Sequence, residues 1–227
     1  MTNPTAESTS RTLPTADGDL HFHEAGAGPP LVLLHGSGPG VSAWANFGDN
    51  LPTFATRFRV LALDLPGFGR SYEPSDNPAL HGPAAVLAFL DGLGLEQVAI
   101  IGNSLGGGIA ARVAANHPDR VTRLVTLGGV GVPLFSTLPS EGITRLVDFV
   151  EDPTRQRLVE WMRSMVYDPA VLTDEFVEKR WRAASDPEAL AGIRRIYNRD
   201  MLAVLRQMML DNTAALALLR QIQAPTL

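Results

Sequence analysis

Cysteine is absent from the 227 residues of this chain, which excludes disulfide bonds, thiolate metal sites and a cysteine nucleophile. Also absent is any apolar run near the ~20 residues that a membrane-spanning helix needs. The 24 acidic residues outnumber the 19 basic ones, and no basic cluster occurs. These absences predict that the protein binds neither nucleic acid nor membranes, and we expect a soluble, cytoplasmic protein.

The composition is that of an ordinary globular enzyme, with 45% hydrophobic and 19% charged residues. The length suits one α/β domain with an insertion. Residues 1–12 are polar and rich in Ser, Thr and Pro, without the apolar segment of a signal peptide. We therefore expect residues 1–12 to form a disordered leader.

Short, continuous apolar runs mark the first half of the chain, after a hairpin strand predicted at residues 20–24. Because the runs do not alternate with polar residues, they indicate strands buried on both faces, as in a parallel sheet. Amphipathic helical segments separate them at 44–54, 84–93 and 105–116. The apolar runs lie at residues 31–34, 60–63, 98–101 and 124–127. The pattern predicts an α/β fold, a mostly parallel sheet with helices on both faces, over residues 13–132.

No strand pattern follows until the end of the chain. Residues 133–222 contain helical stretches separated by Asp-Pro pairs at 152–153, 168–169 and 186–187, where Asp can cap a helix that Pro begins. We interpret this region as a helical lid over the carboxyl edge of the sheet. Residues 223–227 resemble the beginning of another core strand, so we expect the core to lack its last strand–helix units.

A nucleophile motif lies where the third buried run meets a helix. Residues 102–106 (G-N-S-L-G) match G-x-S-x-G, which composition alone would produce ~0.1 times in this chain. Its position between a strand and a helix strengthens the match, since the motif exposes its serine on a sharp, strained turn. We expect Ser104 to be the catalytic nucleophile; the alternative is a serine that only caps the helix.

A glycine-rich loop follows the first buried run, at residues 35–40 (H-G-S-G-P-G). Acyl-transfer chemistry needs two N–H donors directed at the developing oxyanion, one from the residue after the nucleophile and one from an earlier loop. We assign these donors to the backbones of Leu105 and Ser37. The G-x-x-x-x-G-K pattern of a phosphate-binding loop is not present.

Together these motifs resemble the α/β-hydrolase superfamily, and most closely its meta-cleavage-product hydrolases. The resemblance covers residues 20–227 and includes residues 44–46 (W-A-N), 64–69 (D-L-P-G-F-G) and 178–180 (E-K-R). It implies a serine hydrolase that cleaves a C–C bond in a vinylogous 1,5-diketo acid, a 2-hydroxy-6-oxo-dienoate from aromatic or steroid ring degradation. It implies a small-molecule substrate and no metal or organic cofactor, and it leaves a homo-oligomer open.

The resemblance also implies roles for residues around the nucleophile. Arg180 would hold the substrate carboxylate or dienol oxygen; the alternative is a solvated helix arginine beside Glu178. Asn46 could equally be a helix-surface amide, and His35 is expected to fix its loop rather than act as a base. The implied substrate-binding residues are Gly36, Gly38, Asn46, Asn103 and Arg180.

The rest of the catalytic triad is missing from the sequence. In this fold an acid and then a histidine follow the serine along the chain. The only histidine after Ser104 is His117, which lies thirteen residues on at the far end of the predicted helix, ~20 Å away. We therefore expect a truncated, inactive chain whose complete relative has about 280 residues, from ~50–60 additional ones.

Two other functions remain open at this point. One is an ester, lactone or epoxide hydrolase, since one fold supports many chemistries. The other is a non-catalytic fragment or interaction module. The sequence sets neither the substrate's identity and size nor the oligomeric state.

Overall fold

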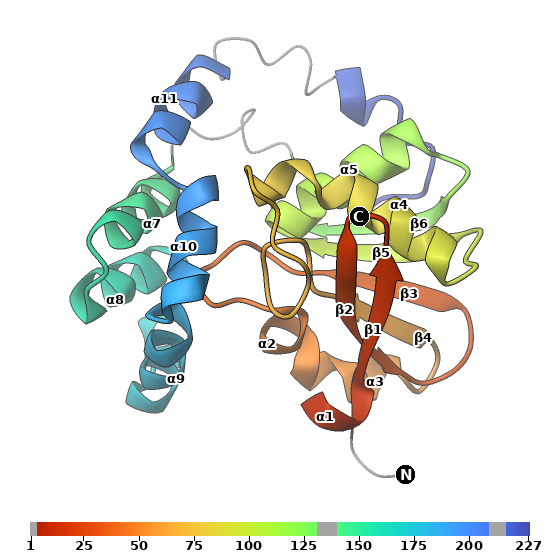
Figure 1. Cartoon of the computed structure of the whole chain (residues 1–227), viewed down its shortest axis with the longest axis horizontal. Coiled ribbons are helices and arrows are strands. Elements are labelled where there is room, and N and C mark those ends of the chain that lie inside the picture. Colours follow the sequence, from red (N-terminus) through yellow and green to blue (C-terminus); the bar gives the residue numbers. More distant parts are fainter. Residues whose placement is uncertain (1–3, 131–139, 209–216) are drawn as a thin grey trace. The chain divides into compact units, whose positions relative to one another are not determined.

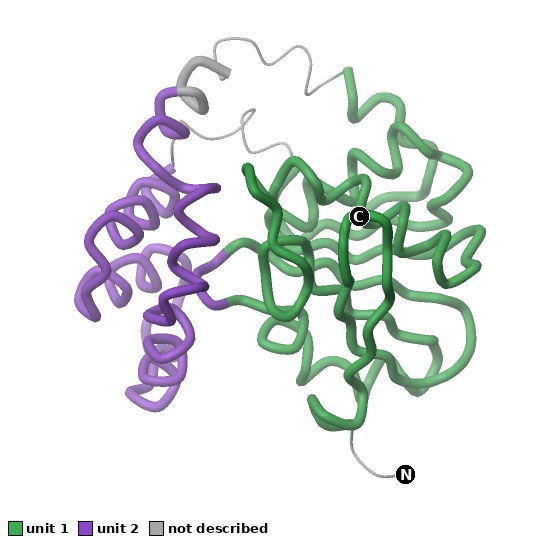
Figure 2. The backbone as a smooth tube through the Cα atoms, in the orientation of Figure 1, with its two compact units in different colours: residues 1–37, 41–131, 214–227 green, residues 38–40, 132–213 purple. Residues whose placement is uncertain are grey.

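The computed structural model describes residues 4–130, 140–208 and 217–227, with main chain only for 204–208. Contacts divide the chain into two units: unit 1 comprises Met1–Ser37, Val41–Gly131 and Ala214–Leu227, and unit 2 comprises Gly38–Gly40 and Val132–Thr213 (Figure 2). No helix within the described ranges is long and apolar enough to cross a membrane.

Unit 1 is built on a six-stranded sheet in the order β1-β2-β4-β3-β5-β6 (Figure 1). β1 and β2 form an antiparallel hairpin, β2 pairs antiparallel with β4, and the other neighbours are parallel. All four predicted parallel strands and the hairpin strand are confirmed. The strands are β1 (Ser10–Thr15), β2 (Gly18–Ala25), β3 (Pro30–Leu34), β4 (Arg59–Leu63), β5 (Val98–Asn103) and β6 (Val121–Leu127).

The centre of the sheet is buried on both faces, as the continuous apolar runs predict. In β3, Val32, Leu33 and Leu34 have no exposed surface, and neither do residues 60–63 of β4. Side chains of one face of these strands pack against the helical segments after β3. This placement puts the carboxyl ends of β3 and β5, which carry the two motif loops, next to each other in the sheet.

The helices of unit 1 match two of the three predictions closely. They are α4 (Gly82–Gly92) and α5 (Leu105–Asn116), with a short 3₁₀ turn η2 (Pro78–Leu80) before α4. The predicted helix at 44–54 is instead three pieces: α2 (Ala43–Phe47), η1 (Gly48–Asn50) and α3 (Leu51–Phe54). Pro52 explains the break before α3, because proline lacks the N–H that would continue the preceding helix.

The expectation of a disordered leader is wrong for residues 4–12; residues 1–3 lie outside the described part. Residues Ala6–Thr9 form α1, which Thr5 and Ser8 close with a reciprocal capping box. Ser10–Thr15 form β1, paired with β2 over its whole length. The polar composition of this segment suggests too little apolar surface for folding. Hydrogen bonds of the capping box and of the ladder between β1 and β2 nevertheless hold it in a regular structure.

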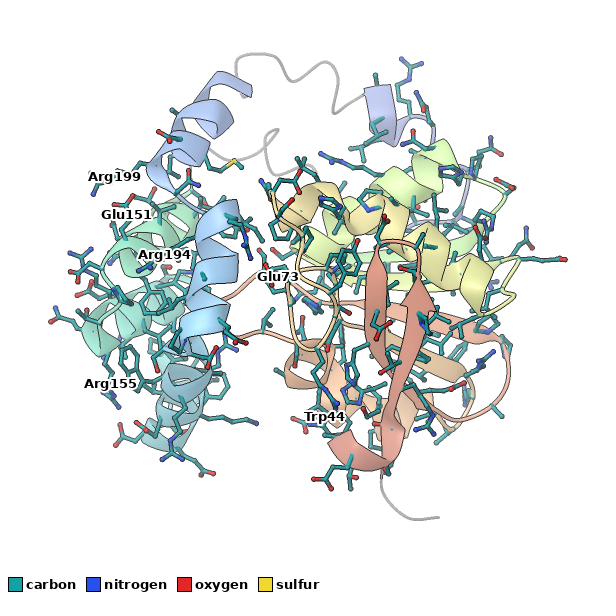
Figure 3. The ribbon with its side chains drawn as sticks, in the orientation of Figure 1. Trp44, Glu73, Glu151, Arg155, Arg194 and Arg199 are labelled. Atoms are coloured by element: carbon teal, nitrogen blue, oxygen red, sulfur yellow. The ribbon has the colours of Figure 1, made fainter. Side chains whose placement is uncertain are left out.

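Unit 2 is helical, as expected, and its described helices are α7 (Glu141–Glu151), α8 (Arg155–Ser164), η3 (Pro169–Val171), α9 (Asp174–Ala184), α10 (Pro187–Ile196) and α11 (Arg199–Met208). Parts of the expected lid, residues 133–139 and 209–216, lie outside the description. Arg199 of α11 forms an ion pair with Glu151 of α7 (Nε–Oε2 2.5 Å), both labelled in Figure 3.

Two of the three Asp-Pro pairs cap a helical element that the proline begins, as predicted, although one of these elements is only a 3₁₀ turn. Asp186 caps α10, and its carboxylate accepts from the Glu188 and Ala189 amides. Asp168 caps only the short η3. After Asp152 the cap is Thr154, whose hydroxyl accepts the Arg157 amide and starts α8 two residues later than predicted.

The last residues of the chain pair with β6. The Leu124 amide donates to the Pro225 carbonyl (3.0 Å), and the Leu227 amide donates to the Leu124 carbonyl (3.0 Å), in a parallel bridge. This bridge agrees with the expected beginning of a strand at residues 223–227. Unit 2 ends at Thr213, whereas we expected the lid to end at residue 222.

Candidate active site

Ser104 lies on the turn between β5 and α5 in a backbone conformation that disfavours side chains. Its φ of 50° and ψ of −112° make it the one non-glycine residue with positive φ in the described ranges. The Ser104 amide donates to the Leu127 carbonyl (3.0 Å), and its own carbonyl accepts from the Gly108 amide (3.1 Å). A strained serine at the end of a buried strand is the geometry of a nucleophile elbow.

Two glycines of the motif allow the backbones around Ser104 to approach closely. A Cβ at Gly106 would collide with the carbonyls of Leu34 and His35, and a Cβ at Gly102 would collide with the Gly106 carbonyl. The Gly106 amide also donates to the His35 carbonyl (3.2 Å). The glycines thus bring β3, β5 and α5 together at the nucleophile.

Asn46 connects the glycine-rich loop to the elbow. Its Oδ1 accepts from the Gly36 amide (3.1 Å) and from Asn103 Nδ2 (2.9 Å). Gly36 packs on the elbow: a Cβ there would lie 3.4 Å from both Ser104 Cβ and Asn103 Nδ2. Asn46 is half-buried and bridges two loops, so the interpretation as a helix-surface amide is wrong.

The two expected oxyanion donors follow the carboxyl ends of the neighbouring strands β3 and β5. Leu105 is the first residue of α5, and the first amides of a helix have no acceptor in their own helix. The positive end of the helix dipole adds to the attraction for an anion there. Ser37 is buried in the loop after β3, one residue beyond Gly36. Their role as donors stays a prediction.

His35 fixes the glycine-rich loop. Its ring has no exposed surface; Nδ1 donates to the Gly36 carbonyl (2.6 Å) and Nε2 accepts from the Leu65 amide (3.0 Å). Burial lowers the pKa of His35, which keeps the ring neutral. Both ring nitrogens are occupied, so His35 is a loop-fixing residue, as expected, and not a base.

The other histidines also have places away from Ser104. His117 is the exposed residue that ends α5, at the opposite end from Ser104, in agreement with the sequence argument. His81 pairs with Asp76 (Nε2–Oδ1 2.5 Å). His21 and His23 belong to a cluster on β2. Within the described residues, no histidine hydrogen-bonds to Ser104.

In unit 2, Arg180 of α9 contacts the segment of the glycine-rich loop that belongs to that unit. Arg180 Nη2 donates to the Pro39 carbonyl (3.1 Å), and a Cβ at Gly38 would lie 3.1 Å from the same nitrogen. Burial lowers the pKa of Arg180. Glu178, the expected surface neighbour, pairs instead with Arg182 (Oε1–Nε 3.0 Å). Arg180 is therefore a largely desolvated cation rather than a solvated helix arginine.

Asp64 is a buried centre that sequence reasoning did not assign to the site, although it begins the D-L-P-G-F-G motif. Its carboxylate accepts from His21 Nδ1 (2.7 Å), the Ala43 amide (2.6 Å) and the Arg70 amide (3.0 Å). Burial raises its pKa, but these hydrogen bonds more than offset burial, and the pKa is lowered. Through Ala43, Asp64 positions α2, the helix that carries Asn46.

Comparison with known proteins agrees with this geometry. The family described as "alpha/beta hydrolase fold" matches residues 29–192. The 2-hydroxy-6-oxo-6-phenylhexa-2,4-dienoate hydrolase of Comamonas testosteroni is 33% identical over 201 residues, which cover 84% of this chain and 70% of that one. A 2-hydroxy-6-oxononadienedioate/2-hydroxy-6-oxononatrienedioate hydrolase of Cupriavidus pinatubonensis (strain JMP 134 / LMG 1197) is 40% identical over 188 residues, 78% of this chain and 64% of the relative.

The structure of the 2-hydroxy-6-oxo-6-phenylhexa-2,4-dienoate hydrolase of Rhodococcus sp. strain RHA1 superimposes with a TM-score of 0.79 and 26% identity. The match covers 96% of this chain and 78% of that one. The chain spans 70% and 64% of the lengths of the two curated relatives named above. The resemblance to meta-cleavage-product hydrolases is confirmed, and the chain belongs to the α/β-hydrolase fold family.

Proposed function

We propose that the protein carrying this chain is a serine hydrolase that cleaves a C–C bond in a vinylogous 1,5-diketo acid. The observation that carries the proposal is the strained Ser104 elbow, joined through Asn46 to the Gly36 loop. The names of the relatives, 2-hydroxy-6-oxo-dienoate hydrolases, support the choice of substrate class. A cytoplasmic location is part of the same proposal, since such substrates are small soluble acids.

In the proposed reaction, the keto oxygen of the substrate accepts hydrogen bonds from the backbone amides of Ser37 and Leu105. These donors are fixed before the reaction, so they stabilise the developing oxyanion without a reorganisation cost. Ser104 is the proposed nucleophilic group, and Asn46 and Asn103 are proposed to present amides to the polar part of the substrate. We assign none of the five histidines of this chain as the proton acceptor, for the reasons given by their contacts.

Arg180 is proposed to bind the substrate carboxylate. Its only hydrogen bond within the described residues is to a neutral carbonyl, and burial destabilises its charge. A carboxylate would restore the lost solvation through a bidentate pair with the planar guanidinium. Gly38, which has no side chain to block that guanidinium, keeps the approach open. The helical unit then acts as the lid that determines substrate size.

The test replaces Arg180 by Ala in the protein that carries this chain. Loss of a charge-assisted pair costs ~1.5–3 kcal/mol, so we expect kcat/KM for 2-hydroxy-6-oxo-6-phenylhexa-2,4-dienoate to fall about 10- to 150-fold. Cleavage interrupts the conjugated chain, and loss of its absorbance measures turnover. Hydrolysis of neutral p-nitrophenyl acetate should change less than about threefold.

Arg182→Ala is the matched control, because Arg182 lies on the same helix but is exposed and pairs with Glu178. It should leave both activities near those of the parent. Equal losses on the diketo acid and the neutral ester in Arg180→Ala would contradict the carboxylate role and favour an ester hydrolase. Ser104→Ala should abolish cleavage of the diketo acid.

A further inference from the structure

A second serine–histidine–aspartate arrangement lies on the first hairpin of unit 1. Ser10 of β1 is the cross-strand partner of His23, two residues from His21 on β2, so Ser10, His21 and His23 share one face of the hairpin. On the other side of β2, the Asp64 amide donates to the His21 carbonyl (2.9 Å). The sheet register therefore brings together three residues from distant parts of the sequence.

Their side chains have the geometry of a nucleophile, a base and an orienting acid. Ser10 Oγ lies 2.8 Å from His21 Nε2, and His21 Nδ1 lies 2.7 Å from Asp64 Oδ2. His21 and Asp64 are 2% and 1% exposed, whereas Ser10 is half-exposed. A serine within hydrogen-bond reach of a histidine that a carboxylate orients is the signature of an activated nucleophile, whatever the order along the chain.

The hydrogen-bond network gives each group the proton that this chemistry requires. Burial raises the pKa of Asp64, but the hydrogen bonds from His21 and two amides more than offset burial and lower it, which favours the carboxylate. The carboxylate accepts the Nδ1 proton of His21, so in the neutral ring Nε2 is the acceptor. Arg70 Nη1 donates to Ser10 Oγ (3.2 Å), so the Ser10 hydroxyl proton is available for His21 Nε2.

A pocket of about 280 Å³ adjoins this cluster. This volume is slightly below the range typical of ligand sites, so it suits a small acyl group. Trp44, labelled in Figure 3 on α2, forms part of the wall, with its ring 5.0 Å from that of His23. The lining also includes His21, Asp64, Ser42 and Arg70, and it includes neither Ser10 nor Ser104, so Ser10 meets this pocket only through its partners His21 and Arg70.

We propose that Ser10, His21 and Asp64 form a second nucleophilic centre that reacts with small activated esters. Ser10 Oγ attacks the ester carbonyl carbon while its proton passes to His21 Nε2, and the guanidinium of Arg70 stabilises the negative charge. The leaving alkoxide departs with the bonding electrons and takes the proton from His21, which leaves an acyl-Ser10. Water, deprotonated by His21, then hydrolyses the acyl group and restores the hydroxyl.

The first experiment isolates this centre from the elbow by using the Ser104→Ala chain, so it does not depend on the proposed function of Ser104. The protein is treated with a small fluorophosphonate and with p-nitrophenyl acetate, and the modified peptide is identified by mass spectrometry. We expect labelling at Ser10. Ser10→Ala in the same background should remove it, and the control Ser75→Ala, at an exposed serine outside the helices and strands, should not.

The second experiment uses the absence of cysteine to measure activation at this position directly. Ser10→Cys and the control Ser75→Cys, at an exposed serine outside the helices and strands, each introduce the only thiol of the chain. The rate of reaction with iodoacetamide is followed from pH 5 to 10. We expect a midpoint near the ordinary ~8.5 for Ser75→Cys and at least one unit lower for Ser10→Cys, because a neighbouring histidine and arginine stabilise the thiolate.

Several charged groups surround residue 10 and contribute to that midpoint: Glu7 on α1, Arg11 on β1, His23 on β2, and Asp64 and Arg70 after β4. Adding His21→Gln to Ser10→Cys separates His21 from them, and it should return the midpoint toward the control. An unlabelled Ser10 in the Ser104→Ala chain, or an unshifted thiol midpoint in Ser10→Cys, overturns the proposal. Circular dichroism confirms that each variant is folded.

Discussion

At Ser104, a reactive hydroxyl and an unfavourable backbone conformation occupy the same residue. Positive φ values such as 50° are adopted readily by glycine, and they cost a residue with a Cβ about 1–3 kcal/mol. Hydrogen bonds to the Leu127 carbonyl and from the Gly108 amide hold the turn in place. Ser104 therefore adopts a conformation that its side chain disfavours. We expect that a residue better suited to this conformation would stabilise the fold but remove the nucleophile.

Replacing Ser104 with Gly and with Ala separates these two contributions. Both substitutions remove the hydroxyl, but only Ser104→Gly relieves the strain, and the greater entropy of glycine in the unfolded chain offsets part of the gain. We expect Ser104→Gly to be more stable than Ser104→Ala by about 1 kcal/mol in urea unfolding. Equal unfolding midpoints would show that the turn is unstrained.

At this scale the sequence predicts those residues whose role is encoded in a local motif. Ser104 and Leu105 are recognisable because the elbow needs a serine between closely spaced glycines at the end of a strand. The bridge that Asn46 makes to Gly36 and Asn103 could not be predicted, since it depends on where α2 begins. The contact between His21 and Asp64, 43 positions apart, likewise requires the register of β2 against β4.

At the scale of elements, the first turn of α5 approaches the sheet closely through glycines. A Cβ at Gly106 would meet the Leu34 and His35 carbonyls, which are backbone atoms of β3 and its loop and cannot rotate away. A Cβ at Gly108 would be 3.5 Å from the Gly129 carbonyl, an ordinary contact. A side chain therefore fits at Gly108 but not at Gly106.

Gly106→Ala and Gly108→Ala test this difference as a matched pair. We expect Gly106→Ala to lower the free energy of unfolding by ~1–3 kcal/mol, because α5 must move away from β3. Gly108→Ala should raise it by up to ~1 kcal/mol, the usual gain from alanine in a helix. Thermal or urea unfolding measures both. A stabilising Gly106→Ala would refute the close approach of helix and strand.

Elements were predictable where apolar pattern and length agree, as for the four parallel strands and α5. They were less so where polar contacts decide the outcome. α1 and β1 form because Thr5 and Ser8 cap each other and because the ladder to β2 satisfies the backbone. Pro52 divides the helical pattern at 44–54, which its apolar spacing alone did not reveal.

At the scale of the whole molecule, buried histidines make stability depend on pH. Burial lowers the pKa of His35 below its ordinary value of 6.5, and burial and the neighbouring His21 lower that of His23. The unfolded chain therefore takes up protons that the folded chain does not. The stability that both groups contribute is fully present above about pH 6.5 and is lost as the pH falls toward their folded-state values.

We expect the urea midpoint to decline between pH 7.5 and 5. It should decline again below about pH 4, because the pKa of Asp64 is lowered in the folded chain and the unfolded chain takes up the proton first. His35→Gln should be less stable than the parent at pH 7.5 but should lose less between pH 7.5 and 5. Tryptophan fluorescence in urea at several pH values provides the measurement. A midpoint that stays constant over that interval would contradict the neutral, buried state of these rings.

The division into two units was only partly accessible from sequence. The helical pattern after residue 132 predicts a separate helical region, but nothing in residues 38–40 indicates that they belong with it. Their membership depends on contacts with residues far along the chain: Gly38 with Trp161, Pro39 with Arg180, and Gly40 with the backbone of Ala183.

The hydrogen bond from Arg180 to the Pro39 carbonyl has a consequence for the order of events during synthesis. The two residues are 141 positions apart. At a translation rate of ~5–20 residues per second, Arg180 is made about 7–28 s after Pro39. Throughout that interval residues 38–40 have been made, while α9, on which Pro39 depends for this contact, has not. The contact between Arg180 and Pro39 can therefore form only after the helical half of the chain has been made.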